Sequence, residues 1–175
     1  VPYEFDQDGI FDLTELDRGL NPEDASDAEA DFDEDGLTNR QEINATDPDQ
    51  DLNHLDIRDA DTDNDGVIDG DEPAWDIDTD RDGAINALDS DSDNDGVLDG
   101  TELGVTQPDP DTQMGDGFRA DEDPETRTDP LRVDSDNDGI ADGVEDANRN
   151  GRLDPGETPA TRDFNYIYCD PTAEL

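Results

Sequence analysis

Apolar side chains along this chain occur singly or in short groups, because Asp and Gly interrupt the sequence every few residues. No apolar run approaches the roughly 18 residues that a membrane-spanning helix needs. Short helices fit best at 12–18, 22–30 and 37–45, and the second of these has Pro22 in a first-turn position. Residues 164–168 alternate as in a strand. The pattern predicts little regular secondary structure, with a few short helices.

The charge balance is extreme, with 55 Asp and Glu against 10 Lys and Arg, a formal net charge of −45, and 29% hydrophobic residues. Such a composition is typical of a disordered chain, because few buried apolar side chains offset the backbone entropy lost on folding. It argues against a conventional globular enzyme with one large core, and against nucleic-acid partners or membrane insertion. The single Cys169 cannot form an internal disulfide. Any order must therefore have another source.

A twelve-residue pattern recurs seven times along the chain. Each copy has oxygen-bearing side chains at positions 1, 3, 5, 9 and 12, Gly at position 6 and usually an apolar residue at 7, as in DTDNDGVIDGDE. A polyanionic tail would have acids without fixed spacing and no Gly at each sixth position. The pattern is instead the ligand spacing of a calcium-binding EF-hand loop. The copies are loop 1 (4–15), loop 2 (31–42), loop 3 (61–72), loop 4 (78–89), loop 5 (91–102), loop 6 (134–145) and loop 7 (146–157).

Calcium chemistry gives each position a role. Ca²⁺ prefers six to eight oxygen ligands at about 2.3–2.6 Å. Alternating side chains at positions 1, 3 and 5 surround half of the ion, and Gly at position 6 permits the positive φ of a sharp turn. Position 7 offers its backbone carbonyl, and a carboxylate at position 12 closes the sphere with both oxygens. Loop 4 ends in the shorter Asp89 and loop 1 begins with Glu4. We therefore predict calcium ions at about seven sites. Ca²⁺ is the one cofactor that we expect.

The spacing of the loops predicts the architecture. Within 61–102 and 134–157 the loops follow one another too closely for the two helices of a full EF-hand, so we expect them to stack directly. The expected fold is a repeat array of tandem calcium-wrapped loops without a large hydrophobic core. Its expected parts are first loops with short helices (1–47), tandem loops (48–103), a linker with a degenerate repeat (104–133), tandem loops (134–157) and an aromatic tail (158–175).

The cassette resembles the thrombospondin type 3 repeat found in bacterial surface and secreted proteins. The resemblance covers 4–157 and rests on the DxDxDGxxDxxE loops, their tandem spacing of 12 or 13 residues, and connectors such as 46–48 and 128–130. Members of this family fold as calcium-wrapped arrays in which ions replace a hydrophobic core, and the resemblance implies the same here. This chain lacks the disulfide-forming cysteines of the animal members, which implies that its order depends more heavily on calcium.

The resemblance also implies which atoms bind the ions. The backbone carbonyls are those of position 7: Ile10, Leu37, Val67, Ala84, Val97, Ile140 and Arg152. The side-chain ligands are those of positions 1, 3, 5, 9 and 12: Glu4, Asp6, Asp8, Asp12, Glu15, Asp31, Asp33, Asp35, Asn39, Glu42, Asp61, Asp63, Asp65, Asp69, Glu72, Asp78, Asp80, Asp82, Asn86, Asp89, Asp91, Asp93, Asp95, Asp99, Glu102, Asp134, Asp136, Asp138, Asp142, Glu145, Asp146, Asn148, Asn150, Asp154 and Glu157.

Other segments carry weaker signals. Residues 109–117 keep an Asp–Gly step but lose the spacing, and we expect weak or no metal binding between Asp111 and Asp116. Residues 30–47 also resemble one half of a dockerin, but a dockerin needs two such halves. We expect Trp75 to pack beside a loop and His54 to lie at the surface. No catalytic motif occurs, and we expect no enzymatic activity.

Extracellular loops of this type bind calcium at roughly 10⁻⁴–10⁻³ M, so we expect an extracellular or cell-surface location. Since residue 1 is Val1, we expect a processed chain or a piece of a longer protein. The expected function is a calcium-stiffened spacer or adhesion segment, whose partners are calcium, other domains of a surface protein or further copies of the chain. Two alternatives stay open: a subunit of a calcium-dependent filament or matrix, and an acidic disordered chain that binds mineral or ions.

Overall fold

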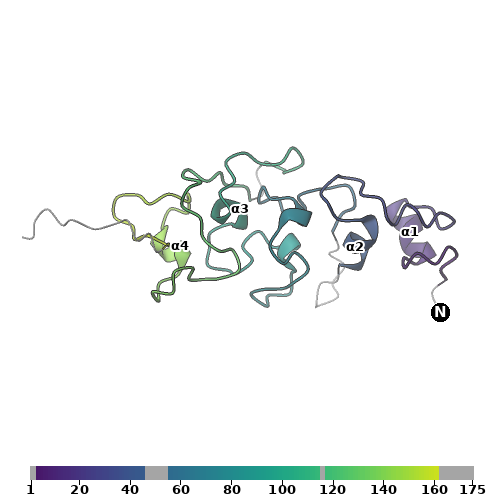
Figure 1. The fold of residues 1–175 in the computed structure, drawn as a ribbon, viewed down its shortest axis with the longest axis horizontal. Helices are drawn as coiled ribbons and strands as arrows, with labels where there is room; N and C mark the ends of the chain where they lie inside the picture. The colour runs from purple at the N-terminus through teal and green to yellow at the C-terminus, as the bar shows by residue number, and fades with distance from the viewer. Residues whose placement is uncertain (1–2, 46–54, 115–116, 162–175) are drawn as a thin grey trace, which may run out of the picture.

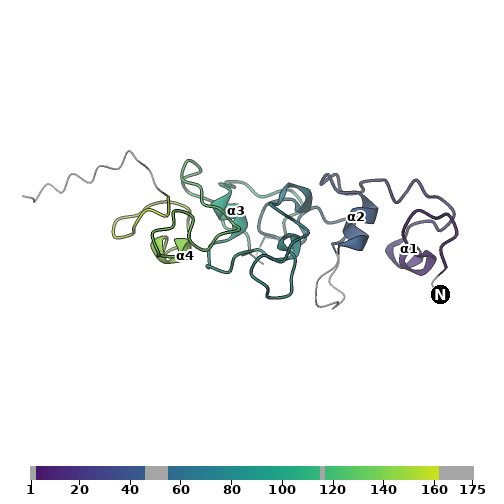
Figure 2. The ribbon, with the colours of Figure 1, turned by 60° about the horizontal axis from the view of Figure 1, so that its bottom comes forward.

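The computed structural model describes residues 3–45, 55–114 and 117–161. In it the chain forms an elongated molecule along which the loops follow one another, with α1 near one end and α4 toward the other (Figure 1; Figure 2). The expectation of little regular secondary structure is confirmed for these residues, which contain short helices and one isolated bridge, between Pro155 and Glu157, but no strand. Nor does any helix among them have the length and apolar character needed to cross a membrane. The connector 46–48, His54, the segment 164–168 and Cys169, for which the sequence carries expectations, lie outside the described ranges.

Each helix begins at position 9 of its loop. The residue before it, at position 8, is extended in every case, so the chain enters the helical turn directly from the loop. A helical turn places residues three apart on one face, so positions 9 and 12 both point back at the loop. The elements are the α-helices α1 (Asp12–Arg18), α2 (Asn39–Asn44), α3 (Asp99–Glu102) and α4 (Asp142–Glu145), and the 3₁₀ turns η1 (Asp69–Asp71) and η2 (Asn86–Leu88).

Two of the three expected helices form. Helix α1 has the expected bounds and ends at Gly19, whose φ of 79° lies in the left-handed region that glycine adopts without strain. Helix α2 is shorter than the expected 37–45 segment because Thr38 caps it. The Gln41 N–H donates to the Thr38 hydroxyl at 3.3 Å, and the Thr38 N–H donates to the Gln41 side chain at 3.1 Å, which forms a capping box.

The expected helix at 22–30 is wrong, because this segment forms consecutive tight turns. The N–H groups of Asp24 and Asp27 donate to carbonyls three residues earlier. Side chains compete for the backbone: the Asp24 carboxylate accepts from the Ser26 N–H and hydroxyl, and the Asn21 side chain accepts from the Glu23 N–H. Short polar side chains of this kind offer the backbone partners that a helix would otherwise supply.

The apolar core is small and lies in the first part of the chain. Two clusters of buried side chains form it, and Trp75 packs against the second cluster, as expected of a packing residue. Among the described residues, the buried hydrophobic side chains all lie between Ile10 and Val97, and buried polar and charged side chains outnumber them. The described part of the chain after Val97 therefore has little apolar burial to stabilise it. The clusters are Ile10, Leu20, Ala28, Ile43 and Ile57, and Leu37, Ala45, Leu55, Ile85 and Ala87.

The segment 104–133, expected to be a linker, packs along the loops in the part that is described. The Thr112 hydroxyl donates to the Asp61 carboxylate, and the Gln113 N–H donates to the Asn64 side chain at 2.5 Å. The Phe118 ring fills the space beside Gly66, where a Cβ would overlap it. This segment therefore covers one side of loop 3.

Candidate metal-binding loops

The seven loops share two unusual backbone conformations. The non-glycine residue at position 4 has a φ between 58° and 70°, and the Gly at position 6 has a φ between 72° and 112°. Left-handed φ values cost a non-glycine residue about 1–2 kcal/mol, least for Asn. The sequence indicated the glycines but not position 4, for which the only signal is that three loops have Asn there. The position 4 residues are Gln7, Glu34, Asn64, Arg81, Asn94, Asn137 and Arg149.

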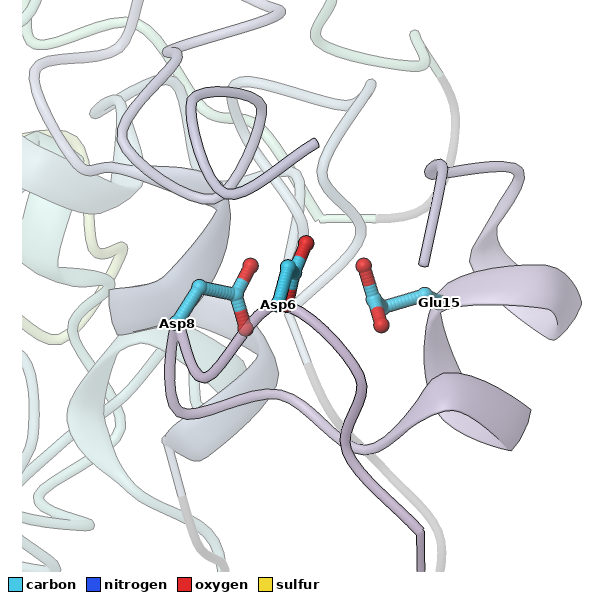
Figure 3. Close-up of side chains that lie close together, drawn as sticks. All are labelled: Asp6, Asp8 and Glu15. Carbon is cyan, nitrogen blue, oxygen red and sulfur yellow. The ribbon is translucent and has the colours of Figure 1, made fainter. Parts of the chain in front are cut away.

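This backbone turns the loop carboxylates toward one point. In loops 2 to 5, one carboxylate oxygen from each of positions 1, 3 and 5 lies within 4.8 Å of the others. In loop 1 the group consists of Asp6, Asp8 and Glu15, whose carboxylates face one another across a small space (Figure 3). The loops therefore bring together the side chains that the sequence assigned to one ion.

Backbone N–H groups hold the carboxylates of positions 1 and 5 in place. At position 5, Asp8 accepts from the Ile10 N–H at 2.8 Å, and the same bond recurs from position 7 in loops 2 to 6. At position 1, the carboxylate accepts from the N–H of the position 6 glycine, as Asp134 does from Gly139 at 2.9 Å. The N–H groups thus orient the side chains before any ion binds.

The glutamate at position 12 is buried in five loops. At most 4% of any of these side chains is exposed, yet neither oxygen of any of them forms a hydrogen bond within the described residues. The hydroxyls of Thr128 and Thr158 lie near Glu102 and Glu145 and offset part of the rise that burial causes in their pKa values, but neither hydroxyl forms a hydrogen bond with them. A buried carboxylate without a partner costs several kcal/mol, which a bound cation would offset. The five are Glu15, Glu42, Glu72, Glu102 and Glu145.

The pKa values of these five glutamates are raised, and acids of the same loop contribute to the rise. Burial is the largest cause of the raised pKa in each one, and the Asp side chains at positions 3 and 5 of the same loop raise it further. The pKa rises to about 7 for Glu15, about 9 for Glu42 and about 10 for Glu102. Without a cation, the loops therefore hold mutually repelling carboxylates that take up protons near neutral pH.

The side chain at position 9 stabilises the loop by accepting a hydrogen bond from its backbone. The N–H of position 2 donates to the position 9 side chain in five loops, for example Thr62 to Asp69 at 2.8 Å. In loop 3 the Thr62 hydroxyl also donates to Asp69, at 2.7 Å, so both oxygens of that carboxylate are engaged. Such a side chain is suited to contact an ion through a water molecule, as is common at this position of EF-hand loops.

A second glycine, at position 10 of loops 3, 5 and 6, joins each loop to an earlier one. The Gly100 N–H donates to the Asp65 carboxylate at 2.5 Å, and the Gly143 N–H donates to the Asp95 carboxylate at 2.7 Å. A Cβ on Gly70, Gly100 or Gly143 would overlap the carbonyl oxygen of that position 5 aspartate. Only glycine permits this approach. The role of these glycines was not predicted, although the repeated Asp–Gly pair at positions 9 and 10 is visible in loops 3, 5 and 6.

Loop 4 ends in Asp89, one carbon shorter than the glutamate of the other loops. Asp89 accepts from the Asp91 N–H at 3.2 Å, and its pKa rises to about 6 because of burial, with contributions from Asp82 and Asp80. Asp89 therefore faces its own loop, but one of its oxygens is engaged.

Loop 7 differs from the others because its acids already have donors. The side chains of Asn148, Asn150 and Arg152 all donate to Asp154, at 2.7–3.2 Å, which lowers the pKa of that carboxyl. Glu157 accepts from the N–H groups of Asn148 and Asp154. The expected ligands of loop 7 thus satisfy one another, and only Asp146 keeps a buried oxygen without a partner.

The donor set of loops 1 to 5 fits a hard divalent cation. The groups consist of carboxylate oxygens, which are the ligands that Ca²⁺ and Mg²⁺ prefer over softer metals. The orphaned oxygens of the buried glutamates are the observation that agrees best with such an ion.

Comparison with known proteins finds no match, whether against family models, curated proteins or solved structures.

Proposed function

We propose that the chain is an extracellular calcium-binding repeat module, of the thrombospondin type 3 kind, in which bound ions give rigidity to a surface or secreted protein. The observation that carries the proposal is the set of five buried glutamates whose oxygens lack partners. The side chains that act on Glu42 and Glu72 are other acids, which add to the cost of burying these two carboxylates.

The proposed ions take the place of a core. Loops 5 and 6 have few buried apolar side chains, so their order depends on drawing carboxylates together around a cation. At calcium concentrations inside cells, loops with affinities of roughly 10⁻⁴–10⁻³ M are empty and repel themselves open. The module would therefore be loose before export and stiff outside the cell. The role is one of spacing or adhesion rather than catalysis.

Calcium-dependent compaction tests the proposal. Small-angle scattering and circular dichroism compare the chain in ~2 mM CaCl₂ with the chain in excess chelator. We expect an elongated rigid particle in calcium and an expanded chain in chelator. Equal dimensions in both conditions, whether compact or expanded, would contradict the proposal and, if expanded, would favour a disordered ion-binding chain.

A second candidate, a self-assembling filament or matrix subunit, is favoured by apolar side chains at the N-terminal end. Leu13 and Leu16 of α1 are 79% and 63% exposed, and Tyr3 and Phe5 beside them are 68% and 55% exposed. Sedimentation in calcium separates the two functions. A monomer at high protein concentration would exclude the filament and leave the spacer.

A further inference from the structure

The buried oxygens without partners follow the loops closely, with two exceptions. Among the described residues, side-chain oxygens of this kind all belong to positions 1, 3, 5, 9 or 12 of a loop, except those of Asp27 and Asp121. Both exceptions lie in the segments that connect loops. Since an orphaned buried oxygen marks the proposed cation ligands elsewhere, these two require the same explanation.

Asp27 lies beside loop 1. Its Oδ2 accepts from the Asn21 N–H at 2.7 Å and its carbonyl accepts from the Asn39 side chain at 2.7 Å, while Oδ1 is buried without a partner. The neighbouring Ala28 is fully buried in the first apolar cluster, which fixes the segment against Ile10 of loop 1. The charge of Asp27 contributes to the raised pKa of Glu15, one of the carboxylates shown in Figure 3, so Asp27 lies near this group.

Asp121 lies against loop 7. The side chain is 4% exposed, its Oδ1 accepts from the Asp123 N–H at 2.7 Å, and its Oδ2 is buried without a partner. A Cβ on Gly151 would overlap this carboxylate, which places Asp121 directly over the turn of loop 7. In the same turn, Asp146 uses Oδ2 to accept from the Gly151 N–H and leaves Oδ1 buried without a partner.

Hydrogen bonds hold the segment around Asp121 beside the turn of loop 7. The Glu122 N–H donates to the Asn150 carbonyl at 2.8 Å, and the Thr126 hydroxyl donates to the Gly151 carbonyl at 2.6 Å. Arg152 forms an ion pair with Glu122 at 2.9 Å. Asp123 and Asp146 both line a cavity, which gives an ion a route to this point. The other acids of loop 7 already have donors, Asp154 from Asn and Arg side chains and Glu157 from backbone N–H groups. Asp121 and Asp146 are thus the two acids here that each keep one buried oxygen without a partner.

We propose that the connecting segments supply ligands of their own for hard divalent cations: Asp27 completes the site of loop 1, and Asp121 binds a calcium ion together with Asp146. This inference rests on the proposed calcium-binding function and adds to it. In this proposal a bound ion bridges the segment 117–133 and loop 7. It also explains how loop 7, with Asn at two ligand positions, takes part in the array.

Calcium titrations of the full chain followed by ¹H–¹⁵N spectra test the proposal. The Gly9 amide reports on loop 1 and the Gly151 amide on loop 7, since each donates to a loop carboxylate. We expect Asp27→Asn to raise the calcium concentration at half-saturation of Gly9 roughly tenfold, and Asp121→Asn to do so for Gly151, because affinity follows the number of charged ligands. Bound calcium at ~1 mM should fall by about one ion per chain in Asp121→Asn.

Matched controls lie in the same segments. Asp24→Asn and Glu125→Gln make the same charge change at exposed side chains. Asn keeps the oxygen that accepts the local N–H, so at ~10 mM calcium both test variants should give the dispersed spectrum of the unmodified chain. Midpoints within twofold of the controls, an unchanged ion count, or a spectrum that stays undispersed at that concentration would overturn the inference. If the unmodified loops fail to respond to calcium, the proposed function itself fails instead.

Discussion

At the scale of single residues, the position 12 glutamate does two opposed things. Glu102 is 2% exposed and surrounded by Asp93, Asp95 and Asp99, so in the absence of a cation its charge destabilises the fold. With a cation it supplies the last two ligand oxygens and fixes the loop to the adjoining helical turn. If the proposed function holds, the same side chain opposes folding without calcium and supports it with calcium.

Replacing Glu102 by Gln should separate these effects. Glu102→Gln removes a ligand charge, so the chain should hold about one calcium fewer at ~1 mM. In chelator near pH 7 the same change should stabilise residual structure by on the order of 2 kcal/mol, because Gln is neutral without the proton that a buried Glu102, with its pKa raised to about 10, must take up on folding. Ion counting and melting curves in chelator measure the two effects, with Glu125→Gln as the exposed control. A variant weakened in both conditions would contradict a ligand role and indicate a packing role.

The ligand positions could be predicted because calcium coordination requires a fixed spacing of acids along the chain, which can be recognised in the sequence alone. Asp6, Asp8 and Glu15 were assigned to one ion from spacing alone, and the fold brings them together. The left-handed backbone at Arg81 could not be predicted, since an arginine gives no such signal. Asp27 and Asp121 lie outside any motif, and only burial without a partner sets them apart.

At the scale of the elements, each short helix is a consequence of its loop. Its turn begins where the loop ends, and its length depends on the residues after position 12, so that α1 has seven residues before Gly19 whereas α3 has four. Helix 12–18 could be predicted because the interval between loops 1 and 2 is long and the segment itself contains no Gly. The absence of a helix at 22–30 could not be predicted, because it results from hydrogen bonds that the Asn21 and Asp24 side chains accept from nearby backbone N–H groups. The contact between Gly100 and Asp65 spans 35 residues and has no local signature beyond the glycine.

The position 10 glycine provides a test of the junction between loops. Gly100 lies in α3 with ordinary helical φ, so Ala there should stabilise the helix by about 0.5–1 kcal/mol if helix propensity alone mattered. We expect Gly100→Ala instead to destabilise the calcium-bound protein by ~1–3 kcal/mol, because the Cβ overlaps the Asp65 carbonyl.

Thermal unfolding in calcium measures this effect. Gly117→Ala is the matched control, since its Cβ would meet no atom closer than 3.6 Å. Stability that rises in Gly100→Ala as the helix propensity of Ala requires would show that the loops do not stack through this contact.

At the scale of the whole molecule, order has two sources with different locations. Apolar clusters support loops 1 to 4, whereas loops 5 to 7 depend on buried polar groups and the proposed ions. Calcium removal should therefore loosen the two halves unequally. In a chelator titration followed by hydrogen exchange, the amides of Asp142 and Glu122 should lose protection before those of Leu20 and Arg40, whose bonds lie beside the first cluster. Loss of protection in the opposite order would contradict the two-source account.

The calcium-free chain should respond to pH in the direction that the raised pKa values require. Glu15, Glu42 and Glu102 have folded-state pKa values of about 7, 9 and 10 against an ordinary 4.5, so the folded state binds more protons across this range. Its stability is then greatest below about pH 4.5 and falls as pH rises through the folded pKa values. In chelator, scattering should show a more compact chain at pH 5 than at pH 8.

A triple variant separates this effect from the general loss of negative charge on acidification. Replacing the same three glutamates by Gln fixes them in the neutral form, so the pH dependence should shrink and the chain at pH 8 should be more compact. An undiminished pH dependence in the triple variant would assign the effect to net charge alone.

The number of calcium ions bound per chain tests the central claim most directly. After equilibrium dialysis at ~1 mM CaCl₂, elemental analysis should find about seven ions, six in the acid-rich loops and one at Asp121 and Asp146. The count should fall when the buried glutamates of loops 1, 2, 3, 5 and 6 are replaced by Gln. Fewer than about five saturable ions, or a count unchanged by those replacements, would contradict the claim that the loops are calcium sites closed by Glu15, Glu42, Glu72, Glu102 and Glu145.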